Sequence, residues 1–129
     1  MCVSPFQIWE TPQLSFHNRS LNSNYVVLSF QNQTLRPILK QQNPLFLILF
    51  TNHIQTFKIP FAQMNEEQQN QCIANALAQN QPFKNTMIGI VVGWFTKEES
   101  NIYCQNRAAF NKRIVQMLIQ RLQDQRTSI

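Results

Sequence analysis

The side chains best suited to covalent chemistry in this chain are its three cysteines and its two histidines. Cys72 and Cys104 are the candidate nucleophiles, and His17 or His53 is the candidate base. Such a pair acts only when the thiol is accessible and a neighbouring base ionises it. Neither histidine lies in a recognisable family signature. A thiol-dependent enzyme or redox protein using Cys72 or Cys104 is therefore an alternative to the main prediction.

Metal and phosphate chemistry lack the residue spacings that they require. The three cysteines lie far apart and form no C-x-x-C pair, so neither a zinc ribbon nor a thioredoxin-like motif is present. Gly89 and Gly93 are the only glycines, which excludes a phosphate-binding loop and a dinucleotide-binding fingerprint. We predict no metal site and no cofactor.

The carboxylates are few and have structural explanations. Two adjacent pairs follow Asn65 and Thr96, at the starts of helical patterns, where acids complement the partial positive charge of a helix N-terminus. Only Glu10 and Asp124 remain, whereas glycosidases and magnesium-dependent enzymes need facing or clustered acids. The protein is therefore predicted not to be an enzyme. The six acids are Glu10, Glu66, Glu67, Glu98, Glu99 and Asp124.

A positive charge balance favours binding instead. Eleven Lys and Arg residues leave a formal net charge of +5, which attracts phosphates and acidic surfaces. Several basic residues lie near the C-terminus among glutamines, and Arg and Gln side chains can also bond base edges. A solvated helix face is the competing explanation. The predicted partner-binding residues are Arg107, Lys112, Arg113, Gln116, Gln120 and Arg121.

Amide side chains replace much of the usual charge. Charged residues make up 13% of the chain, about half the roughly 25% of ordinary soluble domains, while 18 Gln and 14 Asn are present. Amides hydrogen-bond without the desolvation cost of a charge, which suits polar contacts inside an assembly. A composition bias of the genome is the alternative explanation.

The elements that must position these residues are predicted to be strands in the first half. Its apolar residues are aromatic and β-branched and form short runs bounded by Asn, Ser and Pro. A polar loop over 18–24 suggests a hairpin. Pro37 within the segment 35–42, and Pro44 after it, suggest a connector there. The strands are expected at 14–17, 25–30, 45–50 and 54–59.

The second half is predicted to alternate helix, strand and helix. Asn65, with Gln68 in capping-box position, opens a helix that stops before Pro82. A strand apolar on both faces follows over 86–95, with Gly89 and Gly93 on one side as a shallow patch that packs closely against a helix or a ligand.

A capping box at Thr96 and Glu99 predicts a long helix that ends near Gln125. Arg107 and Arg121 fall on the apolar side of this helix, where they must extend to solvent or meet a partner. The apolar stripe consists of Tyr103, Phe110, Ile114, Met117, Leu118 and Leu122, widened by Val115 and Ile119.

Together these elements predict a single α+β domain over 1–129, with 1–12 as a looser N-terminal segment. The order is ββββαβα, with a mixed or antiparallel sheet of four or five strands and two helices packed on one face. The longest apolar runs are far shorter than the roughly 20 residues of a membrane-spanning helix. The odd thiol count and the absence of a leader favour the cytoplasm.

The predicted function is a small, basic, non-catalytic binding or assembly subunit of a nucleic-acid-associated or multiprotein complex. It contacts its partner through the C-terminal helix, with protein and nucleic acid nearly tied as that partner, and no membrane contact is expected. A homo-oligomeric structural protein, packed through the Gly89 and Gly93 face or the helix stripe, is a further alternative.

Overall fold

The chain folds as helices rather than as the predicted α+β arrangement. The computed structural model describes residues 19–129, with side chains from Tyr25 onward, and within this range it contains no β-strand. The prediction of a sheet of four or five strands in the order ββββαβα is therefore wrong. The elements are α2 (Arg19–Phe30), η2 (Gln31–Leu35), α3 (Arg36–Gln41), α4 (Asn43–Thr56), η3 (Phe61–Gln63), α5 (Glu66–Gln79), α6 (Gln81–Val92), α7 (Lys97–Gln105), α8 (Arg107–Asp124) and η4 (Arg126–Ser128).

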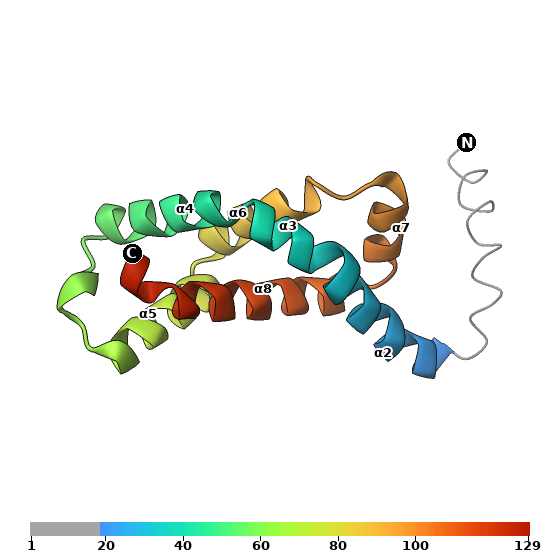
Figure 1. Ribbon diagram of the computed structural model, residues 1–129, viewed down its shortest axis with the longest axis horizontal. Coiled ribbons are helices and arrows are strands. Elements are labelled where there is room, and N and C mark those ends of the chain that lie inside the picture. Colours follow the sequence, from blue (N-terminus) through green and yellow to red (C-terminus); the bar gives the residue numbers. More distant parts are fainter. Residues whose placement is uncertain (1–18) are drawn as a thin grey trace.

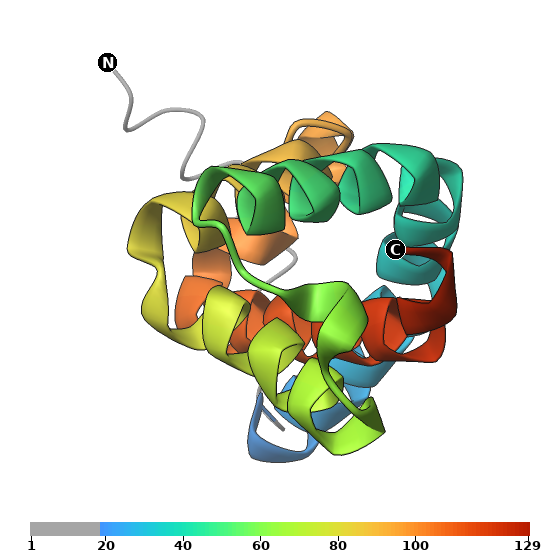
Figure 2. The same cartoon turned by 90° about the vertical axis from the view of Figure 1, so that its left-hand side faces the viewer.

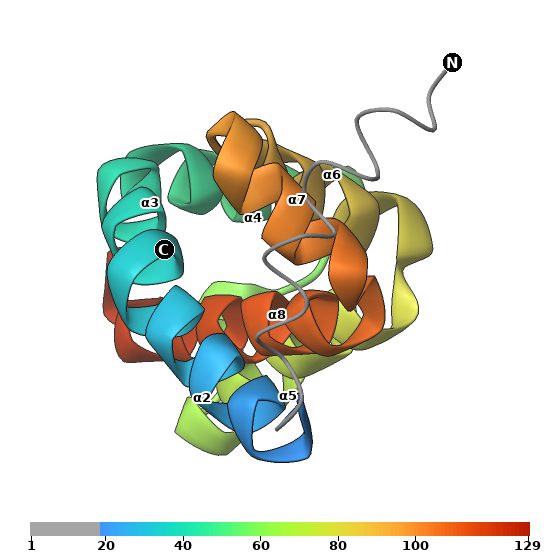
Figure 3. The same ribbon diagram turned by 90° about the vertical axis from the view of Figure 1, so that its right-hand side faces the viewer.

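The helices enclose a common interior. In Figure 1, α8 runs along one long side of the molecule and α4 along the other, while the arm formed by α2, η2 and α3 descends from α4 across α8. The two end views place α3 and α6 on opposite sides of this interior (Figures 2 and 3). Backbone contacts join α5 to both α6 and α8, and they also join α6 to α8.

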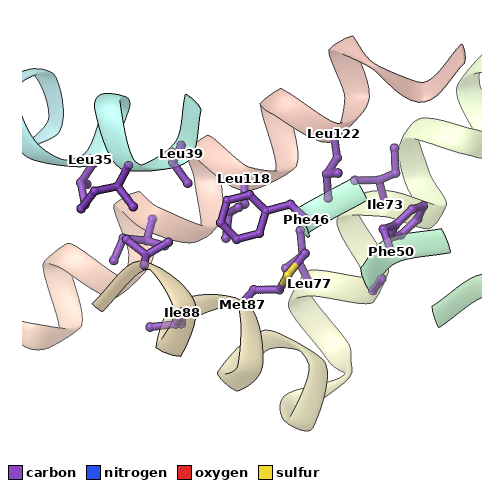
Figure 4. Close-up of a cluster of buried hydrophobic side chains, with 14 of the residues drawn as sticks. Leu35, Leu39, Phe46, Phe50, Ile73, Leu77, Met87, Ile88, Leu118 and Leu122 are labelled. Atoms are coloured by element: carbon purple, nitrogen blue, oxygen red, sulfur yellow. The ribbon is translucent and has the colours of Figure 1, made fainter. Parts of the chain in front are cut away.

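Buried side chains from every α-helix of the described residues, α2 to α8, and from η2 and η3 form the core. Phe46 and Phe50 of α4 have no exposed surface, and they lie among side chains from α5, α6 and α8 in Figure 4. Burial of this apolar surface is the main stabilising contribution to the fold. The other fully buried large side chains are Leu35, Leu39, Ile73, Leu77, Met87, Val91, Phe110, Ile114, Leu118 and Leu122.

The run 45–50 was predicted to be a buried strand because every position is apolar. It forms the first half of α4, which continues to Thr56 and so includes part of the strand predicted over 54–59. Pro44 lies in the first turn of this helix, where its missing N–H leaves no hydrogen bond unmade. A short apolar run does not distinguish a buried strand from a helix, and the buried side chains at 46, 50 and 53 follow helical spacing.

The segment 25–42 was predicted to be a strand followed by a connector. It forms nearly continuous helix, interrupted by one π turn at Gln31–Leu35, in which the Arg36 N–H donates to the Gln31 carbonyl. A proline inside a regular helix clashes with a carbonyl of the preceding turn, and Pro37 lies in the first turn of α3, directly after the π turn. Residues 19–24 of the predicted loop are also helical. The strand predicted at 14–17 lies outside the described residues.

The segment 86–95 was predicted to be a central strand, but most of it belongs to α6. Asn80 caps this helix through a 3.0 Å bond from the Phe83 N–H, and Pro82 lies in its first turn. Pro82 therefore starts a helix instead of only ending one. Gly89 and Gly93 are both exposed, and beyond its own helix the space beside Gly89 is open, so the predicted close-packing patch is wrong.

The predicted helix starts at Asn65 and Thr96 are confirmed, because both capping boxes form with both of their bonds. The long helix predicted from Thr96 is divided, since Asn106 leaves helical geometry at φ −154° and ψ 66° between α7 and α8. Its side chain then accepts a bond from the Ala109 N–H and caps α8. The predicted apolar stripe is buried at residues Tyr103, Phe110, Ile114, Leu118 and Leu122.

Candidate binding surfaces

The six predicted partner-binding residues all lie on α8, but they do not form one site. At 100° per residue, Lys112, Arg113, Gln116 and Gln120 share one face of this helix. Their positions span eight residues, which is about 12 Å along the axis at 1.5 Å per residue. Arg107 begins the helix, and its guanidinium carbon lies 5.7 Å from the centre of the Tyr103 ring.

Three of these residues line a cleft between α2 and α8, which we call the α2–α8 cleft. It has a volume of about 450 Å³, and Lys112 and Arg113 supply its charges while Gln116 adds an amide. No acidic residue lines it in the part of the chain that the structure describes. The cleft therefore combines an apolar lining from Val27, Leu28 and Ala109 with two positive charges. Its lining residues are Val27, Leu28, Asn106, Ala109, Lys112, Arg113 and Gln116.

Large apolar side chains are exposed in this cleft and next to it. Leu28 is 55% exposed, and Tyr25, one helical turn earlier on α2, is 70% exposed. Residues three apart on a helix are neighbours on its surface, so the two side chains form a single apolar patch. An isolated exposed leucine needs no explanation, but a patch beside paired cations is typical of binding surfaces.

Gln120 and Arg121 lie in a different cleft, between α3 and α8. This cleft has a volume of about 320 Å³, and Arg36 and Asp124 also line it. The Gln120 side chain donates a 2.9 Å hydrogen bond to Asp124, so one predicted base-reading amide is already engaged. The acid beside Arg121 makes this second cleft less positive than the α2–α8 cleft.

A third cleft, which the sequence did not predict, lies between α4 and α5. It has a volume of about 590 Å³, and it brings together His53 and Cys72, two of the residues considered for thiol chemistry. We call it the α4–α5 cleft. Its lining residues are His53, Phe57, Ile59, Met64, Gln68, Gln71, Cys72, Asn75, Ala76, Gln79 and Asn80.

Burial opposes catalysis by the thiol and imidazole in the α4–α5 cleft. Desolvation lowers the pKa of His53 below its ordinary value, and desolvation raises the pKa of the Cys72 thiol. Both shifts favour neutral groups, whereas an activated pair would hold a thiolate beside an imidazolium. Cys104 is exposed on α7, and His17 lies outside the described residues.

The acids occupy the helix starts predicted for them. Glu66 and Glu67 lie in the first turn of α5, and Glu98 and Glu99 lie in the first turn of α7. Glu10 lies outside the described residues. Residues 25–129 contain no group of three His, Cys, Asp or Glu side chains that could hold a metal ion.

Many amides serve the fold itself. Asn43 and Gln125 exchange two hydrogen bonds of 2.7 and 2.8 Å, which join the start of α4 to the end of α8. Gln123 donates to the Asn70 carbonyl at 3.1 Å and so joins α8 to α5. Asn65, Asn80 and Asn106 cap helices. These contacts give part of the amide content an intramolecular role.

No family model, curated protein or solved structure is similar enough to this chain to match it. Among the described residues, no helix has both the length and the apolar character that crossing a membrane requires.

Proposed function

We propose that this protein is a non-catalytic binding module that docks an acidic, amphipathic segment of a partner protein in the α2–α8 cleft. One observation carries this proposal: the exposed Leu28 lies in the same cleft as Lys112 and Arg113. An apolar side chain offers a place for a leucine or similar anchor, and the two cations offer partners for carboxylates around it.

The form of the cleft supports a helical or extended segment as the occupant. A groove between two helices accepts an amphipathic helix that lays its apolar face along the floor, with anchors about one turn apart. Tyr25 and Leu28 have this spacing on α2. Tyrosine and arginine are also common among the residues that contribute most to binding at protein interfaces.

Single-stranded nucleic acid is the competing occupant, because the net charge is +5 and an exposed Tyr25 could stack on a base. The arrangement of the cations favours this occupant less. Arg121 lies in the α3–α8 cleft and Arg107 lies against Tyr103. Among the side chains that the structure describes, this leaves Lys112 and Arg113 as the cations beside the apolar patch. A nucleic acid needs a longer track of positive charge along its phosphates.

The test measures fluorescence anisotropy with two labelled probes. One is an amphipathic peptide with leucine at positions i, i+3 and i+7 and glutamate elsewhere, and the other is a single-stranded oligothymidylate. We expect Leu28→Ala and Lys112→Glu each to weaken peptide binding by about tenfold, as for anchor and charge-pair residues of interfaces. Matched controls are Ile48→Ala and Lys97→Glu, which alter exposed residues outside this cleft and should leave binding unchanged.

The pattern of losses separates the two occupants. Peptide binding that depends on both Leu28 and Lys112 supports the proposal. Oligonucleotide binding whose affinity falls steeply with salt and is unchanged by Leu28→Ala would instead identify a nucleic-acid surface. If neither probe binds, or if the controls lose as much affinity as the test variants, the proposal is wrong.

The compartment and the assembly state belong to the same proposal. Free Cys72 and Cys104 suit a reducing compartment, which supports a cytoplasmic location. A solution mass measurement of the purified protein tests the alternative of a homo-oligomer, in which a second copy of the chain would supply the partner surface.

A further inference from the structure

We propose that the α4–α5 cleft is a binding site for a small, neutral, planar molecule with an amide-type hydrogen-bonding edge. This site goes beyond the docking function proposed above, because none of its lining residues lines the α2–α8 cleft. Its volume of about 590 Å³ falls within the roughly 300–1,000 Å³ of known ligand sites.

His53 is the first reason for this inference. Its side chain is only 9% exposed, yet within the described residues its imidazole forms no hydrogen bond. Its ring nitrogens nevertheless keep contact with solvent, because they are not among the fully buried polar atoms that lack a partner. A hydrogen-bonding partner for them would therefore lie in the cleft that His53 lines. A ligand that enters the cleft can supply that partner.

The aromatic rings around His53 favour a planar ligand. The centre of the His53 ring lies 4.5 Å from that of Phe83 and 4.8 Å from that of Phe57. Phe57 is 58% exposed and also lines the cleft, which leaves ring surface open for stacking. Aromatic pairs at such separations stabilise a complex beyond the area that they bury.

The absence of charged residues from the lining of the cleft favours a neutral ligand. No charged residue lines it, and its polar side chains besides His53 are amides and the Cys72 thiol. Gln71 already donates to Asn75 at 2.9 Å, whereas the side chain of Gln79 has no bond within the described residues. An ionic ligand would lose hydration here and gain no opposite charge, while an amide-like edge finds both donors and acceptors.

A soft metal ion fits the cleft less well, although His53, Met64 and Cys72 all line it. Metal binding through cysteine requires the thiolate, and burial raises the pKa of the Cys72 thiol.

The test uses three pyridines of the same shape: nicotinamide, which is neutral, nicotinate, which is an anion, and 3-(aminomethyl)pyridine, which is a cation. The readout is the rate at which iodoacetamide alkylates Cys72, with the exposed Cys104 as the internal reference. Amide chemical shifts of α5 provide the dissociation constants. We expect nicotinamide at saturation to slow alkylation of Cys72 at least fivefold and to leave Cys104 unchanged.

Two matched variants localise the effect. Asn75 and Asn85 are both exposed and accept equivalent bonds, from Gln71 at 2.9 Å and from Gln81 at 3.0 Å. Asn75 lines the cleft and Asn85 does not. We expect Asn75→Trp to block nicotinamide binding and Asn85→Trp to preserve it. His53→Phe, which keeps an aromatic ring and removes the ring nitrogens, should weaken binding about tenfold.

The proposal predicts that nicotinate and 3-(aminomethyl)pyridine bind at least tenfold more weakly than nicotinamide. Absence of protection by nicotinamide, equal affinity for all three probes, or unchanged binding to Asn75→Trp would each overturn it. Tighter binding of the ions would identify a site of another chemistry. None of these outcomes depends on peptide docking at the α2–α8 cleft, so the two proposals fail independently.

Discussion

The α2–α8 cleft and the α4–α5 cleft resemble each other in construction and differ in charge. Each lies between helices, and their volumes are about 450 and 590 Å³. The first is lined by the cations Lys112 and Arg113, whereas the polar lining of the second consists of amides, an imidazole and a thiol. The ligands that we propose for the two clefts therefore differ because of the positive charges in the first cleft, and not because of cleft volume.

The two clefts also differ in how far their apolar walls belong to the core. Leu28 is 55% exposed, so it is available to a partner without disturbing the fold. His53 is 9% exposed and stacks on Phe50, which is fully buried. A partner can bury Leu28 in the α2–α8 cleft without changing the core. The wall of the α4–α5 cleft around His53 is part of the packed fold and is formed before a ligand enters. We therefore expect substitutions in the two regions to affect different properties.

The largest expected effect comes from truncating Phe50, a core side chain that stacks on His53 behind the α4–α5 cleft. Phe50→Ala should lower the free energy of unfolding by about 3–5 kcal/mol, because a buried phenylalanine leaves a cavity. Leu28→Ala should change it by no more than about 0.5 kcal/mol, because the side chain is largely exposed. Urea denaturation measures both. Similar losses for the two variants would remove the distinction between the clefts.

Removing the helix caps near the two clefts should change the free energy of unfolding by smaller amounts. Asn65→Ala removes a capping box with bonds of 2.8 and 3.0 Å at the start of α5, and it should cost about 1 kcal/mol. Asn106 caps α8 beside the α2–α8 cleft through a bond of 3.4 Å, so Asn106→Ala should cost about half as much. Thermal denaturation compares them. A larger loss for Asn106→Ala would show that the break between α7 and α8 is the more important feature.

Acid should destabilise the α4–α5 region through His53, with the smallest effect of the three. Burial lowers the pKa of this imidazole in the folded state below its ordinary value of about 6.5, so the unfolded state takes up the proton first. The contribution of His53 to stability is therefore complete above about pH 7, and it declines as the pH falls through the lowered pKa.

Urea denaturation from about pH 7.5 to pH 5.5 checks this prediction. The wild-type protein should lose more stability over this range than His53→Phe, because phenylalanine does not titrate. Equal slopes for the two proteins would show that burial of His53 does not disfavour its protonation.

Local chemistry made some elements predictable. Asn65 with Gln68 and Thr96 with Glu99 mark helix starts because their bonds involve only residues three apart. The stripe of α8 was predictable because polar residues separate its apolar positions. The strands were predicted wrongly where apolar residues fill every position, as in 45–50, since periodicity is then lost. Pro37, Pro44 and Pro82 were interpreted as breaks, although each lies in the first turn of a helix.

The clefts were predictable only in part. Lys112, Arg113 and Gln116 share a face of α8 by helical spacing alone, so the sequence could group them. The opposing Leu28 was assigned to a strand, and its exposure beside them depends on how the arm crosses α8. His53 and Cys72 meet through the packing of α4 against α5, which no local pattern in the sequence specifies.

A single amide spectrum of the isotope-labelled protein, titrated first with the acidic amphipathic peptide and then with nicotinamide, tests the central claim of two chemically distinct clefts most directly. The account predicts that the peptide shifts amides around Leu28, Lys112 and Arg113, and that nicotinamide shifts amides around Cys72 and Asn75, without competition between the probes. Shifts of one shared set of amides, or no shifts with either probe, would contradict it.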